Sequence, residues 1–205
     1  MNENINNYCQ DLEKEFHLIP ATRKTDLLLL KNYISLKFEK KQIPKIIIIC
    51  THNSRRSHIG QLWLAIGADY YGLPAIQTFS GGTEATAFNI RAVKAFQRIG
   101  LTVESTDNSS NPVYAIKWND AMQPYEAFSK KYEAAPNPKQ DFAAIMVCTQ
   151  ADEGCPIVLG ADFRLALPYD DPKAFDDTEL ESQKYDERIG QIGREILFVL
   201  KQLKP

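Results

Sequence analysis

The sequence carries no strong excess of either charge and no long run of basic residues. Its 24 Lys and Arg are balanced by 26 Asp and Glu, which gives a formal net charge of -2 at pH 7. Proteins that hold nucleic acid by its phosphates need a concentrated basic surface, because phosphate contacts supply much of the affinity. A nucleic-acid partner is therefore not expected.

Long apolar runs are missing as well. No stretch comes near the roughly 18 consecutive apolar residues that cross a membrane as a helix. The first residues, MNENINNYCQDLEKEF, are polar and acidic and lack the basic, apolar and small-residue order of a signal peptide. We therefore expect a cytoplasmic protein without membrane contact.

Cysteine and histidine are both scarce. The four cysteines are Cys9, Cys50, Cys148 and Cys155, and in a reducing compartment such residues are more often free thiols, ligands or catalysts than structural bridges. The last two are too far apart for the short Cys pair of a zinc site, and no histidine lies near them in the sequence. Neither a metal nor another cofactor is expected, and Cys9 has no partner by spacing.

The apolar residues follow two alternating periods. They make up 44% of the chain, enough for one globular core. A β-branched run at 46–49 predicts a strand covered on both faces, and apolar residues from Ile59 to Tyr70 then recur at helical spacing. Further elements are expected as strands at 75–79, 143–148 and 164–167, a helix capped by Asn89, and a final helix over 189–203. This alternation predicts an α/β fold with a parallel sheet.

Two segments lie outside the alternation. Residues 22–41 have the spacing of a charged amphipathic helix, so we expect an N-terminal helical extension over 1–44 and an α/β domain over 45–205. An insertion at about 111–140 is rich in proline and aromatic residues. Aromatic side chains at this density usually serve burial. The insertion is therefore expected to pack on the sheet or its helices, and the alternative is a wall over an active site.

The segment CTHNSRRS, residues 50–57, joins the first predicted strand of the α/β domain to the helix that follows. Ligands of open α/β sheets bind beyond the carboxyl ends of strands, where a helix N-terminus offers free backbone N–H groups to an anion. Those amides, the helix dipole and the Arg56 guanidinium favour a thiolate at Cys50 over a thiol. Arg56 also offers a planar fork for two oxygens of a tetrahedral anion. This Cys-x5-Arg loop predicts a nucleophile in a cradle for a phosphate-like group.

These motifs make the sequence resemble the low-molecular-weight protein tyrosine phosphatases and their relatives, the thioredoxin-coupled arsenate reductases. The resemblance covers residues 45–204 without the insertion and rests on CTHNSRRS, SGGTEATAFN at 80–89, CTQADEGCP at 148–156 and YDDP at 169–172. It implies a four-stranded parallel sheet flanked by helices, with Cys50 as nucleophile. It also implies that Asn53 and Ser57 support the thiolate, within an oxyanion-binding loop of Thr51, His52, Asn53, Ser54, Arg55, Arg56 and Ser57.

A carboxyl group is expected to protonate the leaving oxygen, and two neighbours offer one, Asp170 and Asp171. The residues alone do not choose between them. The resemblance implies Asp171, which stands directly before Pro172. Lys173 and Ala174 follow, where phosphatases of this family carry aromatic residues that hold a phenol ring.

Two further thiols bear on which branch the chain resembles. Reduction of arsenate, a phosphate mimic, needs two electrons, which one cysteine cannot supply repeatedly. Cys148 and Cys155 match the pair that the reductases use, so the resemblance implies thiol exchange from Cys50 to Cys148 to Cys155, with thioredoxin as the final reductant. Seven residues of helix would hold the pair about 10 Å apart, beyond the span of a disulfide, so the segment 148–155 must rearrange.

Other functions stay open at this stage. The chain is also compatible with hydrolysis of phosphotyrosine or another aryl phosphate through a phosphocysteine, in which case Cys148 is a buried small hydrophobe. A third alternative is a non-catalytic anion-binding or thiol-sensing module. The resemblance departs from the family in the loop, where His52 replaces a glycine and Arg55 a common cysteine. Histidine adopts positive φ less easily than glycine, and His52 and His58 are expected at the surface.

Overall fold

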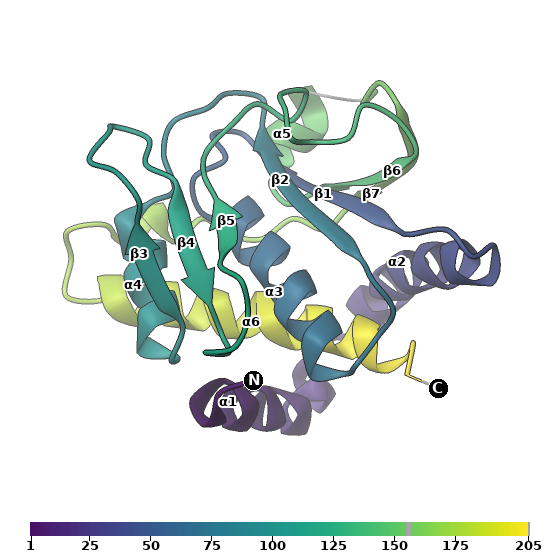
Figure 1. Cartoon of the computed structure of the whole chain (residues 1–205), viewed down its shortest axis with the longest axis horizontal. Coiled ribbons are helices and arrows are strands. Elements are labelled where there is room, and N and C mark those ends of the chain that lie inside the picture. The colour runs from purple at the N-terminus through teal and green to yellow at the C-terminus, as the bar shows by residue number, and fades with distance from the viewer. Residues whose placement is uncertain (155–156, 205) are drawn as a thin grey trace.

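A four-stranded parallel sheet forms the centre of the molecule, as predicted (Figure 1). The structure is a computed structural model that describes residues 1–154 and 157–204. The strands pair in the order β2-β1-β6-β7, and all three pairs are parallel. Their bounds are Lys45–Cys50 for β1, Gln77–Gly82 for β2, Phe142–Met146 for β6 and Ala161–Ala166 for β7. The isoleucine run lies in the central strand β1, and all four of its side chains are buried.

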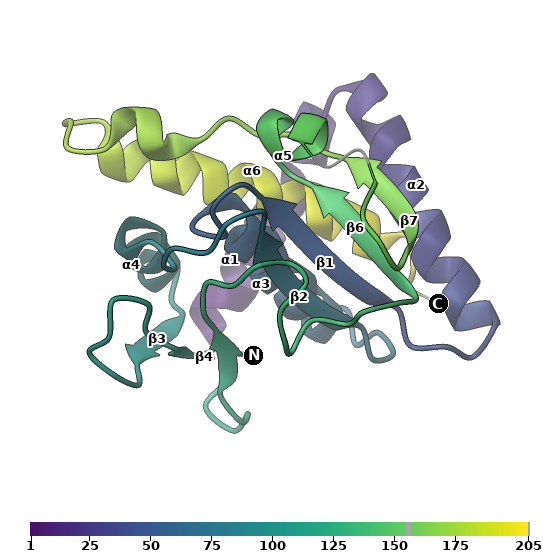
Figure 2. The same ribbon diagram turned by 90° about the horizontal axis from the view of Figure 1, so that it is seen from above.

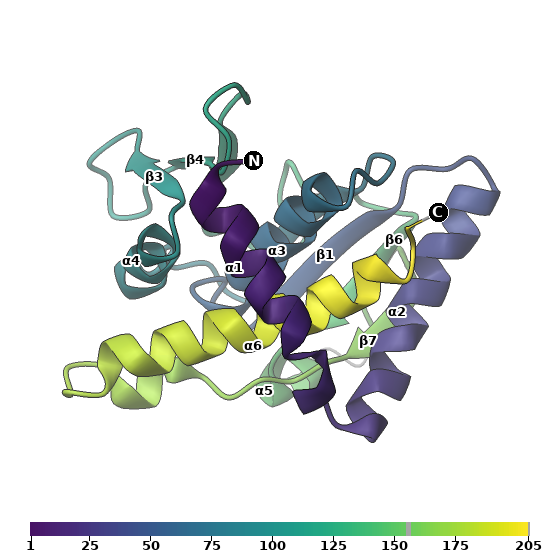
Figure 3. The same ribbon diagram turned by 90° about the horizontal axis from the view of Figure 1, so that it is seen from below.

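The longer helices gather on one face of this sheet, as the opposite views in Figures 2 and 3 show. They are α2 (Ala21–Glu39), α3 (Arg56–Tyr70) and α6 (Glu181–Lys201), with α4 (Ile90–Arg98) beside the amino-terminal half of α6. Tyr33 of α2 stacks on Phe163 of the edge strand β7, with ring centroids 5.1 Å apart. The short α5 (Thr149–Gly154) and η2 (Pro172–Phe175) follow the carboxyl ends of β6 and β7. No helix among the described residues is both long enough and apolar enough to cross a membrane.

The N-terminal extension holds more helix than its polar sequence indicates. Besides α2 it contains α1 (Glu3–Lys14) and η1 (Phe16–Leu18), and the Asn2 side chain caps α1 by accepting the Ile5 N–H. α1 crosses α6 and reaches α3, where Tyr8 stacks on Trp63 (Figure 3). Its inner face buries Cys9, and this burial raises the pKa of the thiol to about 12. Cys9 is therefore a core residue without chemical function.

A second, antiparallel sheet includes two strands from the insertion. Its strands are β3 (Thr102–Ser105), β4 (Tyr114–Lys117) and β5 (Tyr125–Ala127), in that order. The Trp118 indole N–H donates to Asp69 of α3, at 2.9 Å, and the Tyr125 hydroxyl bonds to Thr78 of β2. Trp118 and Tyr125 therefore pack against α3 and β2, as the burial interpretation predicts.

Candidate active site

The loop after β1 lies at the carboxyl edge of the parallel sheet, where α3 begins (Figure 2). Arg55 is the residue before the first turn of α3, with φ -130° and ψ -85°. The first amides of a helix have no intrahelical partner, and the helix dipole makes this end positive. The sequence therefore leads a buried strand directly into an anion-binding helix terminus.

Cys50 lies at the base of this loop and is 4% exposed. Its sulfur is 3.1 Å from the Ser57 hydroxyl oxygen, which in turn accepts the Asn53 side-chain N–H at 2.8 Å. Because the serine oxygen accepts from Asn53, its own proton is free to point to the sulfur. A hydrogen bond of this kind stabilises a thiolate, so the positions predicted from the sequence come together here.

Asn53, not His52, takes the left-handed backbone conformation in the loop, with φ 44°. His52 therefore does not need the positive φ that a glycine would adopt more easily, and asparagine tolerates this region. Two contacts fix Asn53 further: its side-chain oxygen accepts the Lys130 backbone N–H at 2.8 Å, and its carbonyl oxygen lies 3.0 Å from a His58 ring nitrogen. The His52 side chain extends outward, 3.6 Å from Glu84.

His58 is fully buried, so its expected place at the surface is wrong. Its ring stacks on Phe88 with centroids 4.1 Å apart and lies 3.3 Å from the Ser80 hydroxyl. Burial lowers its pKa to about 3, which leaves the ring neutral at physiological pH. The first half of α3 is enclosed on all sides, so a polar residue there supports the loop from within.

Residues at the end of the insertion hold the other side of the loop. The backbone N–H of Gly82 donates to the Lys130 carbonyl, and the Tyr132 N–H donates back to the Gly82 carbonyl, both at 2.9 Å. The Ser129 hydroxyl donates to the His52 carbonyl at 3.2 Å. Lys130 is 6% exposed, and burial lowers its pKa to about 8. Sequence reasoning missed this support, since nothing in FSKKY distinguishes it from a surface segment.

Gly82 allows the loop to pass close to β2. A Cβ atom there would lie 2.6 Å from the Thr51 carbonyl oxygen and 2.7 Å from the Asn53 nitrogen. Gly82→Ala is therefore expected to destabilise the fold by about 1–3 kcal/mol and to weaken phosphate binding, because the loop must move. Urea unfolding and the phosphate-induced shift in melting temperature measure the two effects. Gly154→Ala is the control, since a Cβ there meets no atom within 4 Å, and wild-type behaviour of Gly82→Ala would contradict the prediction.

Arg56 joins the loop to the segment after β7. Its two terminal nitrogens donate to the Tyr169 carbonyl at 2.8 Å and to the Asp171 carboxylate at 2.7 Å. The Asp170 side chain is instead 98% exposed and lies 3.5 Å from Arg188. The two neighbouring carboxylates thus differ in place, and the geometry favours Asp171 as the group that faces a bound anion.

The N-terminal extension reaches this segment through Tyr169. The Tyr169 hydroxyl donates to the buried Glu195 carboxylate at 2.8 Å, and Arg23 of α2 donates to the same oxygen at 2.8 Å. The Arg23 guanidinium also lies over the Tyr169 ring, 4.7 Å from its centroid. α2 therefore helps to fix the start of the chain segment that carries Asp171.

Cys148 lies just beyond β6, separated from it by Val147, and is fully buried. Its sulfur lies 3.4 Å from the hydroxyl oxygen of Thr51, the residue after Cys50. The fold therefore brings this second thiol beside the anion-binding loop, from a position 98 residues further along the chain. Cys155, predicted to act with it, lies outside the described residues.

A cavity of about 460 Å³ opens over the loop. Its lining is mainly polar and includes Arg56, Asp171, Lys173 and Gln150, with Tyr169 as the aromatic member. A groove of about 590 Å³ adjoins it and shares His52 and Lys173, and Phe88 and Tyr114 lie along this groove. The site thus offers an anion cradle within a polar mouth.

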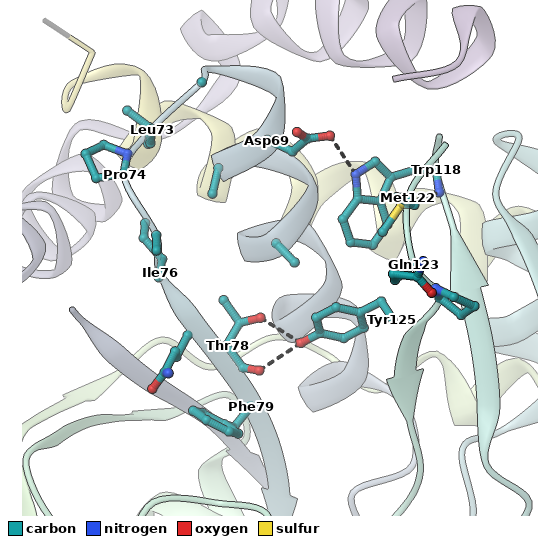
Figure 4. Close-up of a pocket in the computed structure, with 16 residues that line it drawn as sticks. Asp69, Leu73, Pro74, Ile76, Thr78, Phe79, Trp118, Met122, Gln123 and Tyr125 are labelled. Atoms are coloured by element: carbon teal, nitrogen blue, oxygen red, sulfur yellow. Dashed lines mark hydrogen bonds between the residues drawn. The ribbon is translucent and has the colours of Figure 1, made fainter. Parts of the chain in front are cut away.

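A further cavity, of about 580 Å³, lies at the other end of α3 (Figure 4). Asp69 and Trp118 face each other across one side, and the Tyr125 hydroxyl meets Thr78 below them. Its polar side chains thus bond to one another, and its lining includes no residue of the 50–57 loop. We therefore place the chemistry at the loop, although this cavity is larger than the one of about 460 Å³ over the loop.

The Arg55 side chain turns away from the position of an anion. Its Nε donates to the Tyr185 hydroxyl at 2.7 Å, and a terminal nitrogen donates to Asp176 at 3.0 Å.

Among the described residues no group of three or more His, Cys, Asp or Glu is arranged to hold a metal ion.

Comparisons with known proteins agree with this architecture. No family model matches the chain. Its sequence is 28% identical over 127 residues to an arsenate reductase of Brevibacillus brevis, covering 62% of this chain and 75% of that protein. It is 23% identical over 129 residues to arsenate reductase 2 of Staphylococcus epidermidis, covering 62% and 77%.

Solved structures share the fold. A low-molecular-weight phosphotyrosine phosphatase from Vibrio cholerae O395 superposes with a TM-score of 0.51 at 13% identity, over 78% of this chain and 96% of that one. A structure described as an arsenate reductase in the phosphate binding state gives a TM-score of 0.50 at 16% identity, over 78% and 98%. At these identities the likeness concerns the fold.

Proposed function

We propose that the chain belongs to the low-molecular-weight protein tyrosine phosphatase superfamily and that it is a thioredoxin-coupled arsenate reductase. The observation that carries the proposal is the place of Cys148, whose sulfur lies 3.4 Å from the Thr51 hydroxyl at the edge of the anion loop. A phosphatase needs one thiol at such a site, whereas a reductase needs a second within reach of the first. The similarity in sequence to arsenate reductases supports the same choice.

Cys50 begins the proposed reaction as a thiolate, supported by the Ser57 hydroxyl. It attacks arsenic in arsenate, a sulfur–arsenic bond forms, and one oxygen leaves as water after protonation by Asp171. The loop amides of residues 51–57 and the Arg56 fork hold the remaining oxygens. The geometry on which this step rests is the convergence of Cys50, Arg56 and Asp171 at one helix terminus.

Cys148 performs the reduction. Its thiolate attacks the Cys50 sulfur, a disulfide forms, and the electron pair of the sulfur–arsenic bond passes to arsenic, which leaves as arsenite. Cys155 then attacks Cys148, and the Cys50 thiolate is released. The dithiol of thioredoxin reduces the final disulfide. Since Cys148 is fully buried, its exchange with either partner requires that the segment after β6 move.

The mouth of the site favours a small oxyanion over an aryl phosphate. Lys173 lines the cavity directly beyond Pro172, where it offers an ammonium group and no ring to stack on a phenol. Tyr169 also lines it, but its hydroxyl is bound to Glu195 and its ring is covered by Arg23. A free oxyanion needs the cradle alone, so this polar lining is sufficient for arsenate.

Hydrolysis of an aryl phosphate is the second candidate, and the placement of Asp171 favours it. A carboxyl group beside the anion cradle can protonate a phenolate leaving group and then activate water against a phosphocysteine. The groove that Phe88 and Tyr114 line has room for an aromatic ring. A protein that only binds or senses anions would need no such carboxyl group.

One assay separates the candidates. Arsenate reduction and aryl phosphate hydrolysis are measured side by side on the wild-type protein, with and without thioredoxin, its reductase and NADPH. We expect repeated arsenate turnover only with the complete thioredoxin system, and hydrolysis that does not depend on it. Robust hydrolysis without arsenate reduction would assign a phosphatase, and turnover of neither substrate would leave a binding module. A thioredoxin partner also implies the reducing cytoplasm as the place of action.

A further inference from the structure

Arg55 bonds to the residue that follows η2, while its neighbour Arg56 bonds to the residue that precedes it. The Arg55 Nε also lies 4.0 Å from a carboxylate oxygen of Asp171. Asp171 precedes η2 and its carboxylate accepts from Arg56, whereas Asp176 follows η2 and accepts from Arg55. The four residues in between form a single tight turn. Two consecutive arginines of the anion loop thus hold the two ends of one short element.

An anion bound in the loop would affect the contacts of Arg56 but not those of Arg55. Arg56 directs its terminal nitrogens at Tyr169 and Asp171, so an oxyanion in the loop competes with Asp171 for the Arg56 fork. Arg55 has no such competitor. Its Nε and one terminal nitrogen are engaged by Tyr185 and Asp176, which are themselves joined by a 2.8 Å hydrogen bond.

The side chains of Arg55, Asp176 and Tyr185 form a largely buried cluster. The side chains of Arg55 and Asp176 are 10% and 17% exposed, and Tyr185 is fully buried. A buried guanidinium with a bidentate set of partners keeps its geometry better than an exposed ion pair. On the far side, Arg91 of α4 approaches Asp176 at 3.7 Å and also pairs with Glu181 at the start of α6. The carboxyl end of η2 is therefore anchored to α3, α4 and α6.

We propose that Arg55 is a positioning residue, which holds η2 and hence Asp171 over the cradle while the Arg56 guanidinium is occupied by the anion. The proposal rests on the proposed function in that Asp171 is the proton donor. Arg55 itself contacts no substrate. Its task is to limit the movement of Asp171 at the moment when the direct pair with Arg56 is weakened.

Hydrogen exchange with phosphate as the probe tests the proposal without any turnover. Arg55→Met is expected to speed amide exchange of residues 170–178 in phosphate-saturated protein by at least about 10-fold, because local opening of that segment becomes easier. The dissociation constant for phosphate, measured by calorimetry, should stay within about threefold, since Arg55 does not touch the anion. Arg55→Lys retains the charge and is expected to restore part of the protection.

Turnover supplies an independent readout. Arg55→Met should lower kcat/KM for phenyl phosphate by about 10- to 100-fold, as misplacement of a catalytic group does, but lower kcat/KM for 2,4-dinitrophenyl phosphate by less than about threefold. This ratio reports transfer to Cys50, before the phosphocysteine that both esters share reacts with water. The second ester loses a phenolate that needs no proton. Asp171→Asn should give the same pattern, and adding Arg55→Met to it should cost nothing more, because the two residues act as one unit.

Arg98→Met is the matched control, since Arg98 also joins α4 to α6 through Asp186 but lies away from η2. It should leave exchange at 170–178 and both kcat/KM values unchanged. If Arg55→Met does not fold, Tyr185→Phe removes one partner of the same contact and is expected to raise exchange in that segment.

A phosphate affinity more than about 10-fold weaker with unchanged amide exchange would overturn the proposal, as would no change in either quantity. If the wild type turns over no substrate, the proposed function fails, and the exchange data still decide the role of Arg55.

Discussion

Cys50→Ser is expected to abolish both arsenate reduction and aryl phosphate hydrolysis, with a loss of more than about 10⁴-fold in kcat. A serine hydroxyl is a much weaker nucleophile than a cysteine thiol, so the first attack on the anion is lost. Ser57 and Asn53 would still surround the substituted side chain, so the cradle should persist. Phosphate binding is therefore expected to remain within a few-fold of the wild-type affinity. Initial rates and a phosphate titration by thermal shift measure the two quantities.

Cys9→Ala is the matched control for this experiment. Cys9 is as buried as Cys50 but lies on the inner face of α1, away from the loop. Its replacement should leave both rates unchanged and lower stability modestly, because a buried sulfur is removed. A Cys50→Ser protein that turns over either substrate near the wild-type rate would show that the nucleophile is elsewhere.

The backbone of the site could be predicted from the sequence because its signals are local. Four isoleucines make a strand that is covered on both faces, and the apolar spacing from Ile59 to Tyr70 makes the helix that follows. The order strand, loop, helix fixes where the loop lies in a parallel sheet. The anion-binding terminus therefore follows from about 25 residues, without knowledge of the remaining chain.

Side-chain partners from distant segments could not be predicted in this way. Arg55 finds Tyr185 and Asp176 more than 120 residues away, and no pattern around Arg55 indicates either. His58 looked like a surface residue because polar residues surround it in sequence, yet Phe88 and Ser80 enclose it. Such contacts depend on how elements pack, which periodicity does not specify.

The choice between adjacent residues also needed the structure. Asp170 and Asp171 are chemically identical neighbours, and the backbone turns one toward Arg56 and the other into solvent. In the loop, the positive φ falls on Asn53 because the Lys130 amide and the His58 ring hold that residue there. Sequence reasoning considered His52 for this conformation, but the neighbouring residue Asn53 adopts it.

The two downstream thiols give the prediction that separates the branches. Cys148→Ser is expected to release no arsenite, because the thiol that breaks the sulfur–arsenic bond is missing. Cys155→Ser should stop after about one arsenite per protein, because the exchange that regenerates Cys50 is broken. Hydrolysis of aryl phosphate should remain largely intact in both variants, since a phosphocysteine needs only water and a proton donor. Wild-type protein and Cys9→Ala serve as controls that keep both downstream thiols.

The disulfides that accumulate show at which step of the reaction each variant stops. After arsenate treatment without reductant, the wild type should contain a bridge between Cys148 and Cys155, whereas Cys155→Ser should accumulate one between Cys50 and Cys148. The second bridge is expected because Cys148 lies beside Thr51, next to the nucleophile. Peptide mapping by mass spectrometry distinguishes the two. If neither bridge forms, and every thiol variant except Cys50→Ser hydrolyses aryl phosphate at the wild-type rate, Cys148 is a core residue and the chain is a phosphatase.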